Sequence, residues 1–178
     1  FRFFHKTPES PAGPILFKIC VDEFKEKYHQ LRNRYELPTF AYLDKEFGLS
    51  DAIATSKFMP RFPLMAVRRI MVNQLYGWIN YLHNFIMPNP QSAILVAESE
   101  AFTDEQKEEV NKLIKEIMFI NRLSMRLELQ KKEKEEAEFI NRYAEEWKKL
   151  KKQLLRFADI NIEGWKRDMP KDKGSYFG

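Results

Sequence analysis

Apolar residues recur at spacings of three and four along most of the chain, which is the pattern of amphipathic α-helices. Residues 15–35 show it clearly, and Pro38 follows shortly after their end. We expect a short helix over 39–47, stopped by Gly48, because glycine commonly terminates helices. The most apolar segment predicts a longer helix over 64–87, starting at Pro63, and residues 91–101 predict one more short helix. Between Gly48 and Pro63 the pattern is broken.

The longest predicted element opens at Thr103. Gln106 lies three residues later, so the two side chains can form a capping box at a helix start. From Asp104 to Phe157 the chain has no proline and no glycine. One continuous helix of that length would extend roughly 80 Å, at a rise of about 1.5 Å per residue.

This long element has an apolar stripe near each end. The first stripe is Val110, Leu113, Ile117 and Ile120; the last is Ile140, Tyr143, Trp147, Leu150, Leu154 and Phe157, spaced as a coiled-coil heptad seam. The middle, residues 128–136, is nearly all charged, and pairs such as Glu128–Lys132 can support a solvated helix. We therefore favour a strut with two apolar ends. The alternative is a helical hairpin with its turn near 130–134.

The predicted fold class is all-α, because the chain has only 6 glycines and no long alternation of apolar and polar residues. We expect an extended, aromatic-rich arm over 1–14 and a compact helical region over 15–101. A long helix or helical hairpin follows over 103–157, and a short helix and tail over 158–178.

Composition narrows the class of protein. Apolar residues make up 44% of the 178, enough for a core, and the 31% of charged residues is typical of long exposed helices. The net charge of +4 is mild, and acids are interleaved with the basic residues, so no nucleic-acid-binding stripe stands out. Arg68, Arg69 and His83 interrupt the apolar 64–87 segment, so we expect no membrane span. The single cysteine, Cys20, excludes a disulfide within the chain.

No residue pattern indicates catalysis, a cofactor or a metal. Glu26 and His29 form one Glu-x-x-His pair, but a di-iron bundle needs a second copy and two more glutamates. The histidines His5, His29 and His83 lie beside no nucleophile motif, and no phosphate-binding glycine loop is present. We predict a protein that is not an enzyme.

The candidate binding residues lie in the last third of the chain. They are Tyr143, Trp147, Leu150, Leu154, Phe157 and Trp165. The charged stretch 128–136 separates this seam from the first apolar stripe, so the seam must dock on another chain or fold back on its own. We expect other protein subunits as partners. The alternative is a nucleic-acid or ribosome-associated protein that uses a basic patch of Lys148, Lys149, Lys151, Lys152 and Arg156.

The run from Phe157 to Pro170, after a long Glu/Lys-rich helix, resembles the tail of subunit d of the mitochondrial ATP synthase peripheral stalk. The segments 21–28 and 104–110 are also similar to that family, whereas residues 36–102 have no counterpart. The resemblance implies a non-catalytic scaffold subunit in a membrane-associated complex, on the matrix side of the mitochondrial inner membrane. Without it, we expect a cytoplasmic protein.

Overall fold

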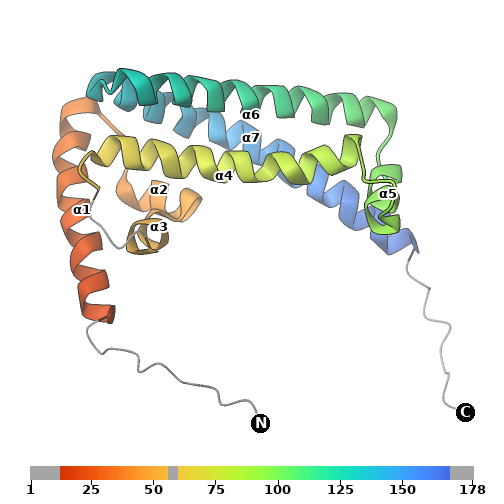
Figure 1. The fold of residues 1–178 in the computed structure, drawn as a ribbon, viewed down its shortest axis with the longest axis horizontal. Helices are drawn as coiled ribbons and strands as arrows, with labels where there is room; N and C mark the ends of the chain where they lie inside the picture. Colours follow the sequence, from red (N-terminus) through yellow and green to blue (C-terminus); the bar gives the residue numbers. More distant parts are fainter. Residues whose placement is uncertain (1–12, 56–59, 169–178) are drawn as a thin grey trace, which may run out of the picture. The chain divides into compact units, whose positions relative to one another are not determined.

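A computed structural model describes residues 13–55 and 60–168, and over these ranges the chain forms helices and no strand, which confirms the all-α prediction (Figure 1). The helices are α1 (Gly13–Tyr35), α2 (Phe40–Phe47), α3 (Leu49–Thr55), α4 (Pro63–Ile86), α5 (Ala93–Glu100), α6 (Asp104–Gln130) and α7 (Glu133–Asp168). Most of the predicted arm lies outside the described residues; Gly13 and Pro14 begin α1.

Local signals set several helix ends. Thr39 caps α2 by accepting a hydrogen bond from the Tyr42 amide at 3.2 Å, and α2 ends at Gly48, whose φ of 63° is left-handed. At the start of α6 the Gln106 amide donates to Thr103 Oγ1 at 3.3 Å, and the Thr103 amide donates to Gln106 Oε1 at 3.0 Å. The predicted capping box is therefore confirmed.

Helix α3 was not predicted from the sequence. Its start is held by Asp44, which accepts hydrogen bonds from the Ser50 amide at 2.6 Å and the Ser50 hydroxyl at 2.8 Å. Leu49 and Ile53 are buried. These contacts with neighbouring elements supply the stability that so short a helix lacks by itself.

Residues 103–157 form a hairpin, so the favoured strut is wrong. Lys131 and Lys132 join α6 to α7, and Lys131 adopts a left-handed φ of 53° without being glycine. Two ion pairs show that the helices run antiparallel: Lys149 Nζ lies 3.6 Å from Glu116 Oε1, and Arg156 Nη1 lies 2.7 Å from Glu109 Oε2.

Helix α7 also runs further than expected. It continues without a break through Asn161 to Asp168, whereas a separate short helix was expected from residue 158. Asn161 does not cap a new helix. Its buried side chain bonds to Tyr81 and Glu98 instead, and α7 passes through it. The rest of the predicted tail, residues 169–178, lies outside the described residues.

The chain divides into two compact units that interleave along the sequence. The first combines the described residues up to Met71 with Leu127–Ala144, and the second combines Val72–Arg126 with the described residues from Glu145. Helices α4, α6 and α7 each contribute to both. The boundary predicted near residues 101–103 lies inside the second unit. No helix within the described ranges combines the length and apolar character needed to cross a bilayer.

Candidate interaction surfaces

The structure buries most of the predicted binding seam inside the chain. Tyr143, Trp147, Leu150, Leu154 and Phe157 are each at most 4% exposed. The first apolar stripe, on α6, is buried as well, and the ion pairs between α6 and α7 bring the helices together. The seam therefore folds back on its own chain, which is one of the two alternatives that the sequence analysis left open. Among the six predicted residues only Trp165 is exposed, at 38%.

An aromatic cluster in the second unit shows what Phe157 contacts. The Phe85 and Phe102 rings stack with their centroids 4.3 Å apart. The centroids of the Phe102 and Phe157 rings are 6.3 Å apart. Tyr81 packs edge-on against Phe85 at 4.6 Å. Such aromatic pairs contribute beyond the area they bury. Phe157 is thus a core residue that ties α7 to α4 and to the loop after α5.

Trp165 lies where α5 packs on α7. Its indole Nε1 donates to Glu98 Oε1 at 3.3 Å, and the Asn161 amide donates to the same oxygen at 3.4 Å. Asn161 also donates to the Tyr81 hydroxyl at 3.2 Å. Glu98 thus fixes two side chains of α7 in place.

The two helices approach so closely here because Gly164 has no side chain. A Cβ atom added at Gly164 would lie 2.6 Å from the Cβ of Ala101, a distance that forces the helices apart. We expect Gly164→Ala to lower the free energy of unfolding by about 1–3 kcal/mol, as overpacking does. Gly77→Ala in α4 is the matched control, because nothing lies within 4 Å of its added Cβ. It should stabilise by about 0.5–1 kcal/mol. Urea unfolding followed by circular dichroism measures both, and an equal effect of the two changes would contradict the close approach.

Large apolar side chains remain exposed mostly in the second unit. Eight of the ten among the described residues belong to it, and only Phe62 and Leu129 belong to the first. Three of the eight lie on α7: Leu155 is 56% exposed, Ile162 52% and Trp165 38%. Their spacings of seven and three residues place them on one side of the helix. We call these three residues the α7 stripe.

The two ends of the charged stretch 128–136 are engaged by α4, which corrects the sequence-based expectation for Glu128 and Glu136, whereas Leu129 and residues 131–134 remain exposed as expected. Arg68 of α4 is only 1% exposed, and its Nε donates to Glu136 Oε2 at 2.5 Å, while Glu136 is 3% exposed. Arg68 Nη2 also donates to Glu128 Oε2 at 2.8 Å. The sequence could not show this, because Arg68 lies 60 or more residues from both glutamates.

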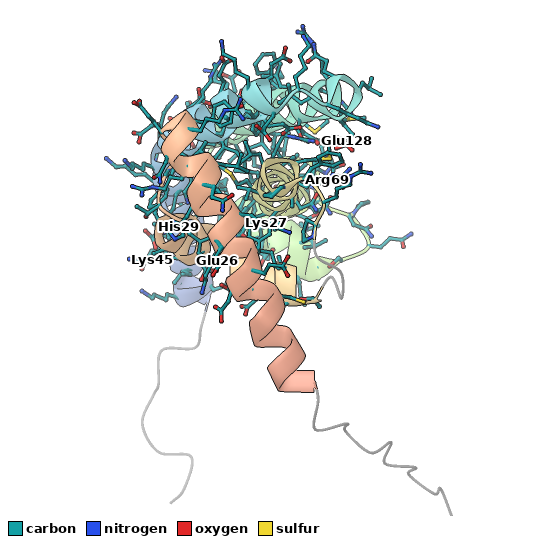
Figure 2. The ribbon with its side chains drawn as sticks, turned by 90° about the vertical axis from the view of Figure 1, so that its left-hand side faces the viewer. Glu26, Lys27, His29, Lys45, Arg69 and Glu128 are labelled. Atoms are coloured by element: carbon teal, nitrogen blue, oxygen red, sulfur yellow. The ribbon has the colours of Figure 1, made fainter. Side chains whose placement is uncertain are left out.

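Arg69 completes the ionic cluster at its solvent side. Its Nε donates to Glu128 Oε2 at 3.0 Å, and its Nη2 also bonds to the same carboxylate (Figure 2). Hydrogen bonds from Arg69 and then from Arg68 lower the pKa of Glu128 to about 2. Glu128 is therefore ionised throughout the physiological range. The other oxygen of Glu136, Oε1, is buried without a hydrogen-bond partner.

The basic patch predicted on α7 is largely matched by acids. Lys148 Nζ lies 3.3 Å from Glu145 Oε2, and Lys149 and Arg156 pair with glutamates of α6. Sequence reasoning missed a different set of cations, on α6. Lys112, Lys115, Arg122 and Arg126 are all exposed, and within the described ranges none of them forms an ion pair. The signal that could have revealed Arg122 and Arg126 is the acid-free run from Ile117 to Leu127.

The Glu26–His29 pair lies exposed on α1 (Figure 2). Over the residues that the structure describes, no group of three or more histidine, cysteine, aspartate or glutamate side chains is arranged to hold a metal ion.

Comparison of the chain with models of protein families, with curated proteins and with solved structures finds no match.

Proposed function

We propose that this chain is a non-catalytic helical scaffold subunit of a larger protein assembly. The α7 stripe carries the proposal. Leu155, Ile162 and Trp165 expose apolar surface along one side of a helix whose neighbouring side, which includes Leu154, Phe157 and Asn161, is buried. Contiguous exposed apolar surface usually marks an interaction site, whereas single exposed apolar residues need no explanation.

We further propose that the assembly is the peripheral stalk of mitochondrial ATP synthase. This part of the proposal comes from the sequence resemblance. Residues 21–28 and 104–110, which carry part of the resemblance, lie in helices α1 and α6. The tail differs from expectation in structure, because α7 continues to Asp168, whereas a separate short helix was expected from residue 158. The stalk assignment therefore depends on the sequence match, while the scaffold role depends on the exposed α7 stripe.

We expect the double change Leu155→Ser and Ile162→Ser to release the chain from its assembly. Truncating a central apolar contact costs about 2 kcal/mol or more, so incorporation should fall at least about tenfold. The measurement is the amount of tagged full chain that co-migrates with the assembly in native extract. Leu129→Ser is the matched control, because Leu129 is 85% exposed but belongs to the first unit and not to the stripe.

Mass spectrometry of the co-purified proteins then separates the two levels of the proposal. ATP synthase subunits among them would support the stalk assignment. A different assembly, lost on changing the stripe, would keep the scaffold role and reject the stalk. Undiminished incorporation of the double variant would overturn the proposal that the α7 stripe is the binding surface.

A further inference from the structure

The outer side of α6 combines exposed apolar side chains with cations that form no ion pair with any residue the structure describes, although Arg122 Nη1 donates to Met125 Sδ at 3.1 Å. Phe119 is 57% exposed and Met125 53%. Lys115, Arg122 and Arg126 lie between them and are exposed too. We call these five residues the cationic face of α6.

The cationic face is directed away from the core. Its opposite side is the buried stripe that includes Val110, Leu113 and Ile117. From Asn111 to Arg126 the only acidic residue is Glu116, whose carboxylate is engaged by Lys149 of α7 at 3.6 Å. The positive charge of the face is therefore not balanced by acids of its own helix.

The order of residues around the helix identifies the shape of a partner. At 3.6 residues per turn, the three cations form a central ridge, with Phe119 on one side and Met125 on the other, within roughly 120° of the helix surface. A complementary surface has carboxylates along its middle and apolar side chains at both edges. An α-helix with acidic residues on one stripe and apolar residues beside it presents that arrangement.

We propose that the cationic face of α6 docks an acidic amphipathic helix of a partner protein. Carboxylates of the partner would face Lys115, Arg122 and Arg126, and its apolar side chains would cover Phe119 and Met125. Methionine adapts its shape to different apolar neighbours, which suits it to such a surface. The inference rests on the proposed scaffold function, and it adds a second surface with a partner of stated chemistry.

Two other anionic surfaces fit the face less well. An interfacial helix on a bilayer has its apolar residues in the middle and its cations at the edges, because the middle enters the acyl region. Here the order is reversed, so a flat bilayer would meet the cations first. Nucleic acid would match the cations through its phosphates, but phosphates offer nothing to cover Met125 and Phe119.

The test uses the full chain and a labelled synthetic peptide. The probe is a helical peptide with a glutamate stripe flanked by leucines, and fluorescence anisotropy reports binding. A second peptide of the same composition has its glutamates scattered around the helix. We expect Lys115→Glu with Arg122→Glu to weaken binding of the striped peptide by at least about tenfold, because like charges then oppose each other. Phe119→Ala should weaken it as well.

The matched control is Lys45→Glu with Lys134→Glu. It makes the same change in net charge at exposed lysines of α2 and α7 (Lys45 is labelled in Figure 2), outside the cationic face. The affinity of this variant for the striped peptide should stay within about twofold of the unaltered chain, since neither lysine belongs to the cationic face and exposed charges are screened by salt. Circular dichroism of every variant checks that helix content is kept.

Several outcomes would overturn the inference. One is equal binding of the striped and scattered peptides. Another is equal weakening by the control pair. A third is that the striped peptide does not bind, whereas phosphatidylserine vesicles or duplex DNA bind to the chain and lose this binding when Lys115 and Arg122 are changed. The scaffold proposal fails separately, through undiminished assembly of the α7 stripe variant, so the two failures can be told apart.

Discussion

Arg68→Ala is expected to lower the free energy of unfolding by about 3–5 kcal/mol, which is the cost of removing one partner from a buried ion pair. The reason is the environment of Glu136, which is only 3% exposed and whose second oxygen has no hydrogen-bond partner. Without Arg68 its carboxylate loses the donor on Oε2 and stays buried. Urea unfolding followed by circular dichroism gives the measurement.

Arg69→Ala is the control for this change. Arg69 is the next residue, bonds to the same Glu128, and has a side chain that is 54% exposed. Its removal should cost about 1 kcal/mol or less, because exposed ion pairs contribute little. The combined change Arg68→Met with Glu136→Met should recover part of the loss, since it leaves no unpaired charge in the core. Equal effects of Arg68→Ala and Arg69→Ala would contradict the burial of this pair.

Trp147→Ala should destabilise the folded chain by about 3–5 kcal/mol, the usual cost of truncating a large buried aromatic side chain. Trp147 is 4% exposed and lies on the buried side of α7. The sequence analysis placed Trp147 among the candidate partner-binding residues, so its loss would be expected to weaken assembly. The structure instead predicts that the substitution lowers the stability of the chain itself. The measurement is a lower urea midpoint for unfolding of the isolated chain.

Leu155→Ala on the exposed side of α7 is the comparison, because Leu155 is 56% exposed. Its effect on unfolding should stay within about 0.5 kcal/mol. The effects of Lys148→Ala and Lys152→Ala on the free energy of unfolding should be similarly small. An unchanged midpoint for Trp147→Ala, combined with loss of assembly, would restore the original interpretation of this residue.

Helix positions could be predicted well because their signals are local. The expected helices over 15–35, 39–47, 64–87 and 91–101 correspond closely to α1, α2, α4 and α5. Their ends follow from capping side chains, proline and glycine, which act within a few residues. Gly48, for example, has the left-handed backbone that its place after α2 predicts.

The features that were missed depend on contacts distant in sequence. The turn at Lys131 has a left-handed backbone without glycine or asparagine, so no local residue marks it. The burial of Glu136 requires Arg68, which a sequence window around the charged stretch does not contain. The buried seam around Trp147 follows from the same turn, because only the reversal brings α7 back along α6. The hairpin alternative, with its turn near 130–134, was correct, and the preference for a strut changed the expected role of the binding residues.

The interleaving of the two units has a consequence for synthesis. Residues up to Met71 cannot complete their unit until Leu127–Ala144 have been translated, and Val72–Arg126 then wait for the residues from Glu145 onward. Domains made of one continuous segment can fold in turn as they leave the ribosome. Here the apolar sides of α1, α4 and α6 have no complete core to enter until α7 emerges. A nascent chain stalled before α7 should therefore be a strong chaperone client, and neither unit can be separated by a single cut.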